Sequence, residues 1–362
     1  MPGKEQGVLI NIKGGKIMKI MKFCYLICFF LFFSGSVTKS TVSAQPSSLT
    51  KEEMLQYTAL WKGERFPDGR PKVPDNIISR MKYVTITEAW GSLQGMTDEG
   101  TTQVGAGSRG ASNYTNQYYG GFKQMYDDIT ICGRASTIQF MPFRPDVNSA
   151  IQVQGTKDGR SRGQYTWGID QLQAGDVYVA NVCEAVLDAS HVGDNLGTAI
   201  LTKSGNGAII RGTVRDLEGN MKLKGFNVFV RDFRPESNSS NMVIGINGPI
   251  QIGYVTVMPG DIVLAKREGV VFIPPHLATE VVEQSEKIRL QDVFAHKGVM
   301  EGRFSAQQAD GGFTDAMNLE FTQWLKDNAD NMEDFFDDPK KAPSPDIIRK
   351  YVKERESRAV QK

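Results

Sequence analysis

The chain has 362 residues, with 42 Lys and Arg against 41 Asp and Glu, and apolar side chains make up 40% of it. This composition is enough for an ordinary buried core and excludes an intrinsically disordered chain. The near-zero net charge gives no general field that would collect nucleic acid or anionic membrane, so we expect no nucleic-acid partner.

Residues 1–44 have the pattern of a secretory signal peptide. Lys19 and Lys22 precede an apolar run over residues 23–33, and a polar stretch ends in a small-residue cleavage pattern at Ala44. The run is shorter than the roughly 20 apolar residues that a membrane-spanning helix needs, so we predict cleavage after Ala44 and no stable membrane span. We therefore expect an exported protein, either periplasmic or secreted.

The start of the chain leaves two alternatives open. Residues before Met18 match no part of a signal peptide, which indicates that the natural chain starts at Met18 or Met21. A retained membrane anchor is one alternative to cleavage. A lipid on Cys28 is the other, although Ile27 replaces the small residue expected before a lipidated cysteine.

Cleavage would leave Cys132 and Cys183, each in or beside an apolar, strand-like run. The simplest interpretation is two small buried side chains. A disulfide between them stays an alternative, because an exported compartment permits one and sequence does not give the distance that such a bond requires.

Residues 45–75 predict an N-terminal helix and linker. Residues 48–61 are amphipathic and opened by Ser48 or Thr50, and the Pro- and Gly-containing residues 64–75 form a spacer. A second helical pattern, over residues 76–90, has apolar side chains at mixed helical spacing, and we expect it to pack in the core.

The main domain, placed at residues 76–276, contains two Gly-rich insertions. Residues 91–121 have neither helical nor alternating periodicity and predict a long loop or flap, which could act as a lid over a site. Residues 149–173 predict another surface loop. The glycines at 105–110 lack the Lys-Ser/Thr ending and the strand-to-helix context of a phosphate loop, so we do not expect phosphate binding.

Short β-rich runs alternate with helical patterns through this domain, which predicts an α/β fold. The runs cover residues 129–141, 177–182, 208–210, 227–230, 254–257, 262–264 and 270–273. Residues 277–362 change character and predict a helical extension, with helices over 277–294, over 314–328 and from Pro345 to about Glu356. We expect this extension to pack across a neighbouring subunit or the domain surface.

The most informative segment, residues 192–216, reads as loop, helix, strand and then Arg215-Asp216. Asp194 is placed to cap a helix that begins near Asn195, and Gly205 is placed to end it. The free N–H groups of that first turn can receive an anion. The strand after the helix would deliver Arg215 and Asp216 beyond its carboxyl end, where ligand sites of open α/β sheets lie.

These side chains suit a carboxylate and a hard cation. Arg215 offers a planar fork for a carboxylate and a permanent positive charge beside a carbonyl oxygen. Asp216 is an oxygen ligand of the kind that Mg²⁺ accepts together with water and substrate oxygens. Taken singly, an Arg-Asp pair is more often a surface ion pair, and Asp194 alone is more often only a helix cap.

The spacing of Asp194 to Arg215-Asp216 resembles the signature of the 4-hydroxy-4-methyl-2-oxoglutarate aldolases, a family that includes the regulator of ribonuclease activity A (RraA). The resemblance covers roughly residues 84–275 and is most specific between Asp194 and Asp216. It continues in residues 133–137, 175–179, 247–250, 257–263 and 268–274.

This resemblance implies an RraA-like swivelling β/β/α sandwich, here with additional C-terminal helices, assembled as a homotrimer or hexamer. It implies a lyase that cleaves a 4-hydroxy-2-oxo dicarboxylic acid to pyruvate with Mg²⁺ or Mn²⁺, and that could also decarboxylate oxaloacetate. The turn formed by Gly193, Asp194, Asn195 and Leu196 would bind the substrate carboxylate through its N–H groups. Arg215 would hold the 2-oxo acid, Asp216 would ligate the metal, and Asp194 would position a metal-bound water.

The chain departs from the family pattern before its last strand, where Lys266 and Arg267 leave only Glu268 as a carboxylate that could support the metal site indirectly. This departure and the insertions put the substrate in doubt. His191, beside the motif, is a tempting base, but a loop histidine with no paired carboxylate is more often incidental. A non-catalytic RraA-like regulator or a metabolite-binding protein is the alternative function.

Overall fold

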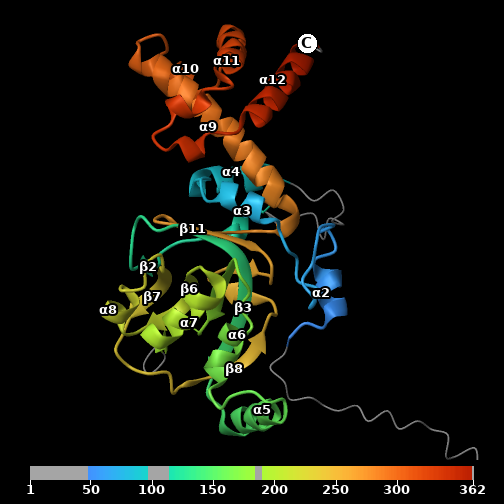
Figure 1. The fold of residues 1–362 in the computed structure, drawn as a ribbon, viewed down its shortest axis with the longest axis vertical. Coiled ribbons are helices and arrows are strands. Elements are labelled where there is room, and N and C mark those ends of the chain that lie inside the picture. The colour runs from blue at the N-terminus through green and yellow to red at the C-terminus, as the bar shows by residue number, and fades with distance from the viewer. Residues whose placement is uncertain (1–47, 97–113, 184–189, 361–362) are drawn as a thin grey trace, which may run out of the picture. The chain divides into compact units, whose positions relative to one another are not determined.

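We describe residues 48–96, 114–183 and 190–360 of a computed structural model (Figure 1). The predicted signal peptide and much of the predicted flap lie outside these residues. A large mixed sheet forms the centre, in the strand order β1-β12-β11-β3-β4-β6-β7-β2. Helices and strands alternate through it, which confirms the predicted α/β class.

The middle of the sheet is parallel. It consists of β3 (Ile131–Pro142), β4 (Asp176–Asn181), β6 (Ala208–Val214) and β7 (Val228–Phe233). The short β5 (Ser190–Val192) runs parallel beside the end of β6. Because parallel strands end at one edge, the segments that follow β5, β6 and β7 meet at the carboxyl edge of the sheet.

The two faces of this sheet carry separate apolar layers. One face packs Tyr178, Ile210 and their neighbours against α6 (Trp167–Asp170) and α7 (Asp194–Ser204). The other face packs Val179, Ile209 and their neighbours against the hairpin of β9 (Ile250–Ile252) and β10 (Val255–Val257). The layer order is therefore β/β/α.

Antiparallel strands complete the sheet. β11 (Ile262–Lys266) pairs with β3 and with β12 (Gly269–Ile273), and β12 pairs with β1 (Tyr118–Tyr119). β8 (Asn241–Ile246) pairs with the end of β3, and β2 (Lys123–Gln124) with β7.

Residues 48–96 form three helices instead of the two predicted for this stretch. α2 (Lys51–Tyr57) starts at a capping box on Thr50, which is one of the two residues, Ser48 and Thr50, predicted to open it. The pattern over residues 76–90 divides into α3 (Asp75–Met81) and α4 (Ile86–Gly95), because a capping box on Thr85 starts a new helix. The loop predicted over residues 91–121 was therefore wrong at its start, because residues 91–95 belong to α4.

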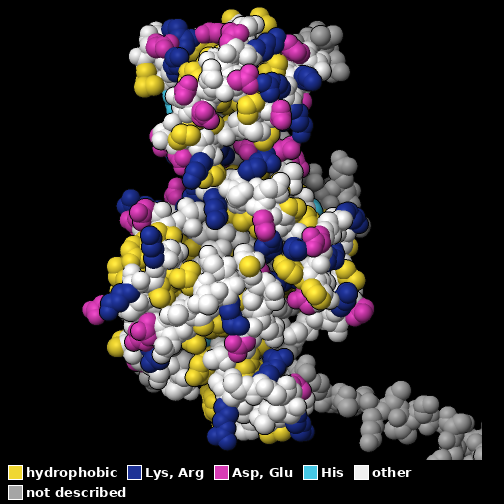
Figure 2. Space-filling model, viewed as in Figure 1, with side chains coloured by type: hydrophobic (Ala, Val, Ile, Leu, Met, Phe, Trp, Pro, Cys, Tyr) yellow, Lys and Arg dark blue, Asp and Glu magenta, His cyan; other side chains and the backbone are white. Residues whose placement is uncertain are grey.

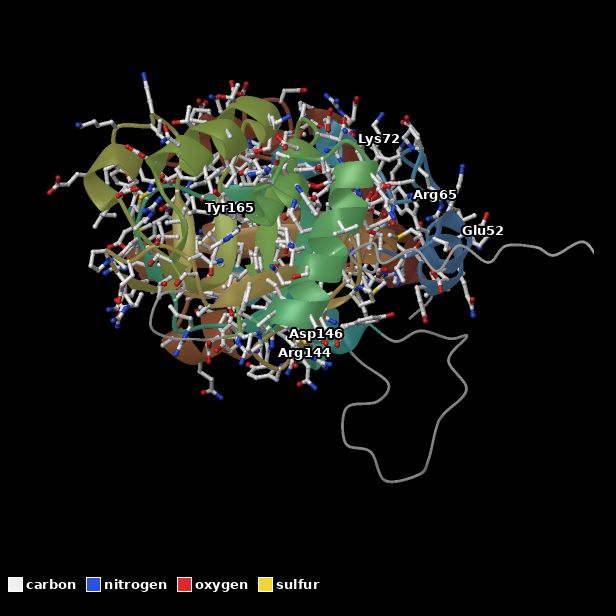
Figure 3. The ribbon with its side chains drawn as sticks, turned by 90° about the horizontal axis from the view of Figure 1, so that it is seen from below. Glu52, Arg65, Lys72, Arg144, Asp146 and Tyr165 are labelled. Carbon is white, nitrogen blue, oxygen red and sulfur yellow. The ribbon has the colours of Figure 1, made fainter. Side chains whose placement is uncertain are left out.

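Residues 149–173 are mostly helical, so the prediction of a surface loop was wrong. Pro145 opens α5 (Pro145–Lys157), and α6 follows after a short 3₁₀ turn. The apolar side chains of Trp167 and Ile169 are buried against the sheet, which fixes this stretch as part of the domain. An exposed ion pair between Arg144 and Asp146 stands at the start of α5 (Figure 3).

The C-terminal residues form the predicted helices. α9 (Ala278–Met300), α10 (Ala306–Asp310), α11 (Asp315–Asn328) and α12 (Pro345–Val360) follow the last strand. The first half of α9 packs on α3 and α4, and its second half joins α11 and α12 in an aromatic-rich core of their own. Buried or half-buried ion pairs, Arg80–Glu286 and Arg289–Glu88, fasten α9 to the sheet domain.

The structure also bears on membrane spans, surface charge and the two cysteines. Among the described residues, no helix is long and apolar enough to cross a membrane. On the face seen in Figure 2, Lys and Arg are interspersed with Asp and Glu, so that face has no single-sign field. Cys132 is buried and Cys183 half-buried; both are free thiols, directed at the carbonyls of Ile78 and Phe140.

Candidate active site

The carboxyl edge of the sheet brings together the two ends of the predicted motif. β5 and β6 are in register at Val192 and Val214, and the N–H of Arg215 donates to the carbonyl of Val192 at 2.9 Å. Gly193 and Asp194 therefore follow one strand, and Arg215 and Asp216 follow its neighbour. The spacing of 22 residues in sequence becomes a contact in space.

Helix α7 starts one residue earlier than predicted. Gly193 is the N-cap, and Asp194 is the first helical residue, so Asp194 does not cap the helix with its side chain. Its Oδ1 instead accepts the N–H of Asn195 at 2.8 Å, which takes one of the first-turn donors. The helix ends as predicted, with Gly205 in the left-handed conformation at φ 68°.

Gly193 lets the acidic and basic side chains approach the helix start. The residue is buried, and a Cβ added to it would collide with Oδ2 of Asp216 and lie 3.1 Å from Nε of Arg215. Its backbone is extended, a conformation open to any residue, so glycine is needed for space rather than for its backbone freedom.

Asp216 has a strained backbone, with φ 54° and ψ 44°. A left-handed conformation costs a non-glycine residue on the order of 1–2 kcal/mol, and such residues persist where the surrounding structure holds them. Its Oδ2 lies 3.5 Å from Nε of Arg215, and the two side chains are 45% and 41% exposed. An ion pair this exposed adds little stability, so its arrangement calls for another explanation.

The donor set fits a hydrated Mg²⁺ or Mn²⁺ better than a zinc ion. Among the described residues no group of three or more His, Cys, Asp or Glu side chains could hold a metal. Zinc needs three or four such ligands, whereas Mg²⁺ takes one or two carboxylates and completes its shell with water and substrate. Asp216 is accessible enough to be such a carboxylate.

A family model described as RraA-like, Aldolase/RraA, matches residues 101–272. The matched region, just under half of the chain, is RraA-like. An uncharacterized protein of Methanocaldococcus jannaschii is 30% identical over 118 residues, which cover 33% of this chain and 52% of that protein. A Halalkalibacterium halodurans protein with the provisional name 4-hydroxy-4-methyl-2-oxoglutarate aldolase is 25% identical over 95 residues, 26% of this chain and 45% of the relative. The chain thus spans about half the length of these relatives.

A solved structure agrees with this RraA-like fold. The crystal structure of an uncharacterized protein from Pseudomonas syringae pv. tomato superposes with a TM-score of 0.52 at 18% identity. It covers 68% of this chain and 98% of the other. At this identity the likeness concerns the fold alone.

Glu268 does not join the RraA-like motif within one chain. It lies in the turn between β11 and β12, and β11 runs antiparallel to β3, with Ala265 opposite Ile131. That turn is therefore at the amino edge of the parallel strands, away from Asp216. The carbonyl of Glu268 accepts the hydroxyl of Tyr118 at 2.7 Å.

His191 is a core residue rather than a base in the site. It is on β5, not in a loop, and is buried. Its Nε2 lies 2.6 Å from the Tyr178 hydroxyl, and its ring packs on Tyr178 and Phe140. Burial lowers the pKa of His191 to about 3, so the ring is neutral at physiological pH.

Sequence reasoning missed Asn220, the last residue of α8 (Leu217–Asn220). It is completely buried, and its Nδ2 donates to the carbonyls of Arg215 at 2.9 Å and Asp216 at 3.2 Å. The available signal was its position one helical turn after Asp216. Gly219, beside it, leaves room for the side chain of Asp194.

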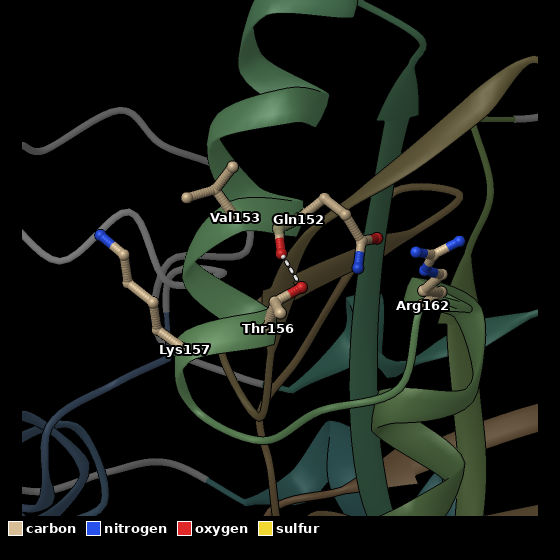
Figure 4. A pocket seen from close by; sticks show the side chains of 5 residues that line it. All are labelled: Gln152, Val153, Thr156, Lys157 and Arg162. Atoms are coloured by element: carbon tan, nitrogen blue, oxygen red, sulfur yellow. Dashed lines mark hydrogen bonds between the residues drawn. The ribbon is translucent and has the colours of Figure 1, made fainter.

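A surface hollow of about 600 Å³ on α5 is a separate feature (Figure 4). It is lined by Gln152, Val153, Thr156, Lys157 and Arg162, and the Thr156 hydroxyl is satisfied by the Gln152 carbonyl. The lining contains no carboxylate and no strand end. The hollow therefore lacks the chemistry found at the carboxyl edge.

Proposed function

We propose that the protein is a divalent-metal-dependent lyase that cleaves a 4-hydroxy-2-oxo dicarboxylic acid to pyruvate. The observation that carries this proposal is the meeting of Arg215 and Asp216 with the start of α7 at Gly193. The similarity to the RraA-like model and to a relative with an aldolase name supports it.

Arg215 and the start of α7 would bind the 2-oxo acid. The guanidinium is 41% exposed and its contact with Asp216 is a loose 3.5 Å, so it can turn toward a substrate carboxylate. The positive end of the helix and its N–H groups, from Gly193 to Leu196, favour the same anion. Since Asp194 already takes the N–H of Asn195, we assign the carboxylate to the remaining donors of the turn.

Asp216 would hold the cation together with water and substrate oxygens. When bound, the cation stabilises negative charge on the oxygen of the 2-oxo group as that charge develops. Arg215 adds a second positive charge at the same side of the substrate. The half-exposed position of both side chains leaves room for the substrate to complete the arrangement.

The reaction needs one proton removed and one added. The substrate's 4-hydroxyl loses its proton to a water that Asp194 orients, the C3–C4 bond breaks, and C4 becomes a carbonyl. The electron pair of that bond forms the enolate of pyruvate, which is then protonated at C3. Loss of CO₂ from oxaloacetate gives the same enolate, so we propose decarboxylation as a second activity.

The test is a pyruvate-release screen of the purified chain across 4-hydroxy-2-oxo acids and oxaloacetate. Release should require Mg²⁺ or Mn²⁺ and stop with chelator. Release that continues in chelator would contradict the metal, and no release from any substrate would favour a non-catalytic regulator or a metabolite-binding protein.

We also propose export and self-assembly, on the signal pattern and the family resemblance. Expression of the full chain should yield a secreted or periplasmic protein whose first residue is Gln45. Sedimentation of that protein should give a trimer or hexamer. A protein that retains residues 1–44, or that sediments as a monomer, would contradict the respective proposal.

A further inference from the structure

Asn220 joins the two halves of the candidate site. Its Nδ2 bridges the carbonyls of Arg215 and Asp216, and its own N–H donates to the Asp216 carbonyl at 2.9 Å. Three hydrogen bonds from one residue therefore close the turn that contains the left-handed backbone of Asp216.

The other side of Asn220 faces helix α7. Its Oδ1 is buried without a hydrogen-bond partner among the described residues, and a Cβ added to Gly197 would collide with it. Gly197 lies one turn into α7, and its N–H donates to the carbonyl of Gly193. The amide of Asn220 is thus wedged between the Arg215-Asp216 turn and the helix that begins beside Gly193.

We propose that Asn220 is a positioning residue, which sets the Asp216 carboxylate and the Arg215 guanidinium relative to the start of α7. The inference rests on the proposed function, because the geometry it maintains is that of the metal and carboxylate sites. A buried carbonyl bridge of this kind acts on a metal site through the ligand it orients. Asn220 itself touches neither substrate nor cation.

The chain contains a matched control in Asn227. It is also completely buried, and its Nδ2 also donates to two backbone carbonyls, those of Tyr126 at 2.9 Å and Ile129 at 3.0 Å. Asn227 immediately precedes β7, at the amino edge of the sheet and away from Asp216. Asn→Leu at either position removes two side-chain donor bonds at similar volume, and at Asn227 it also removes the acceptor of the Met125, Tyr126 and Val228 N–H groups, so the control should lose at least as much stability.

The experiment compares the full chain with Asn220→Leu and Asn227→Leu. Mn²⁺ affinity is measured by titration with paramagnetic resonance detection, stability by thermal unfolding, and kcat and KM by pyruvate release. We expect Asn220→Leu to weaken Mn²⁺ binding about ten-fold or more and to lower kcat, whereas Asn227→Leu destabilises without changing Mn²⁺ affinity. Unchanged Mn²⁺ affinity in Asn220→Leu would overturn the positioning role.

A crystal structure of Asn220→Leu separates this inference from the proposed function. We expect the backbone of Asp216 to leave the left-handed region when its carbonyl loses the side-chain bridge. Asp216 in its original conformation would overturn the positioning role, whatever the activity. Absence of Mn²⁺ binding and turnover in the unaltered chain would instead contradict the proposed function.

Discussion

The two edges of the central sheet each hold arginine and aspartate side chains, but in opposite surroundings. At the carboxyl edge, Arg215 and Asp216 are half-exposed and 3.5 Å apart. At the amino edge, Arg70 and Asp176 are fully buried and 3.0 Å apart. The same side-chain types therefore form an accessible pair at one edge and a buried pair that fixes the chain at the other.

The buried pair belongs to a network that attaches the N-terminal segment. Arg70 stacks on Phe66, and Arg134 binds Asp75 and the carbonyl of Val73. Burial raises the pKa of Asp176, while Arg70 opposes that shift. Because a buried charge that loses its partner is costly, this network should affect stability far more than the exposed pair does.

The largest expected effect is the loss of catalysis in Asp216→Asn. Asn accepts a left-handed backbone as Asp does, so the fold should remain, but the negative charge of the proposed metal ligand is lost. We expect kcat/KM for pyruvate release to fall by about 10²–10³-fold or more, with thermal unfolding unchanged. The control is Asp146→Asn, which alters the exposed Arg144–Asp146 pair. Full activity in Asp216→Asn would remove the proposed mechanism.

At the amino edge, a substitution should lower stability and leave activity unchanged. Arg70→Met leaves Asp176 buried and without its main partner, which costs roughly 3–5 kcal/mol of unfolding free energy. Urea unfolding measures the loss, and turnover per folded molecule should stay unchanged. Arg144→Met, which breaks an exposed pair, should cost under about 1 kcal/mol. Equal losses in the two variants would contradict the distinction between the edges.

Gly193→Ala tests the packing at the carboxyl edge. The extended backbone tolerates alanine, but the new methyl group must displace the Asp216 carboxylate. We expect turnover and Mn²⁺ affinity to fall by about ten-fold to 100-fold, as when support for a metal ligand is removed, with little change in stability. Gly91→Ala is the control, since a Cβ there meets no atom within 4 Å. An unchanged Mn²⁺ affinity in Gly193→Ala would refute the close approach of Gly193 to the Asp216 carboxylate.

Asp261 offers a smaller, pH-dependent effect, because it is a buried carboxylate that has no cationic partner among the described residues. Burial raises its pKa to about 8. The unfolded carboxyl ionises near pH 4 and the folded one near pH 8, so its contribution is complete below pH 4 and is lost as pH rises toward 8. Between pH 6 and 7, ionisation of Asp261 should lower the unfolding free energy by up to about 1.4 kcal/mol. Asp261→Asn should lack this pH dependence. Parallel stability curves for the two proteins would disprove this.

Local signals were sufficient for much of the fold. The β-rich runs, the glycine at the end of α7 and the cap of α2 at Thr50 act within a few residues, and each is present in the structure. The helix over residues 145–157 was missed because only Ile151 and Gly155 of it are buried, so it has little apolar periodicity.

The candidate site depended on more distant relations. The meeting of Gly193 with Arg215 and Asp216 was predictable from the strand and helix pattern, because parallel strands end at one edge, whereas the roles of these residues stay predictions. Glu268 was assigned to the same region because the direction of β11 is not visible in a local pattern. Asn220 was missed because its importance comes from contacts with Gly197 and with two carbonyls, which only the packed structure reveals.

Helix α9 determines where the protein can be truncated, because it belongs to two apolar cores. Val281 and Val282 fill the apolar seam beneath α3 and α4, whereas Leu290 and Phe294 belong to the C-terminal core. One continuous helix therefore contributes buried side chains to both cores. A chain cut before Ala278 would uncover an apolar stripe on α3 and α4, and such stripes promote self-association. The sheet domain that carries the candidate site should therefore be purified together with the C-terminal helices.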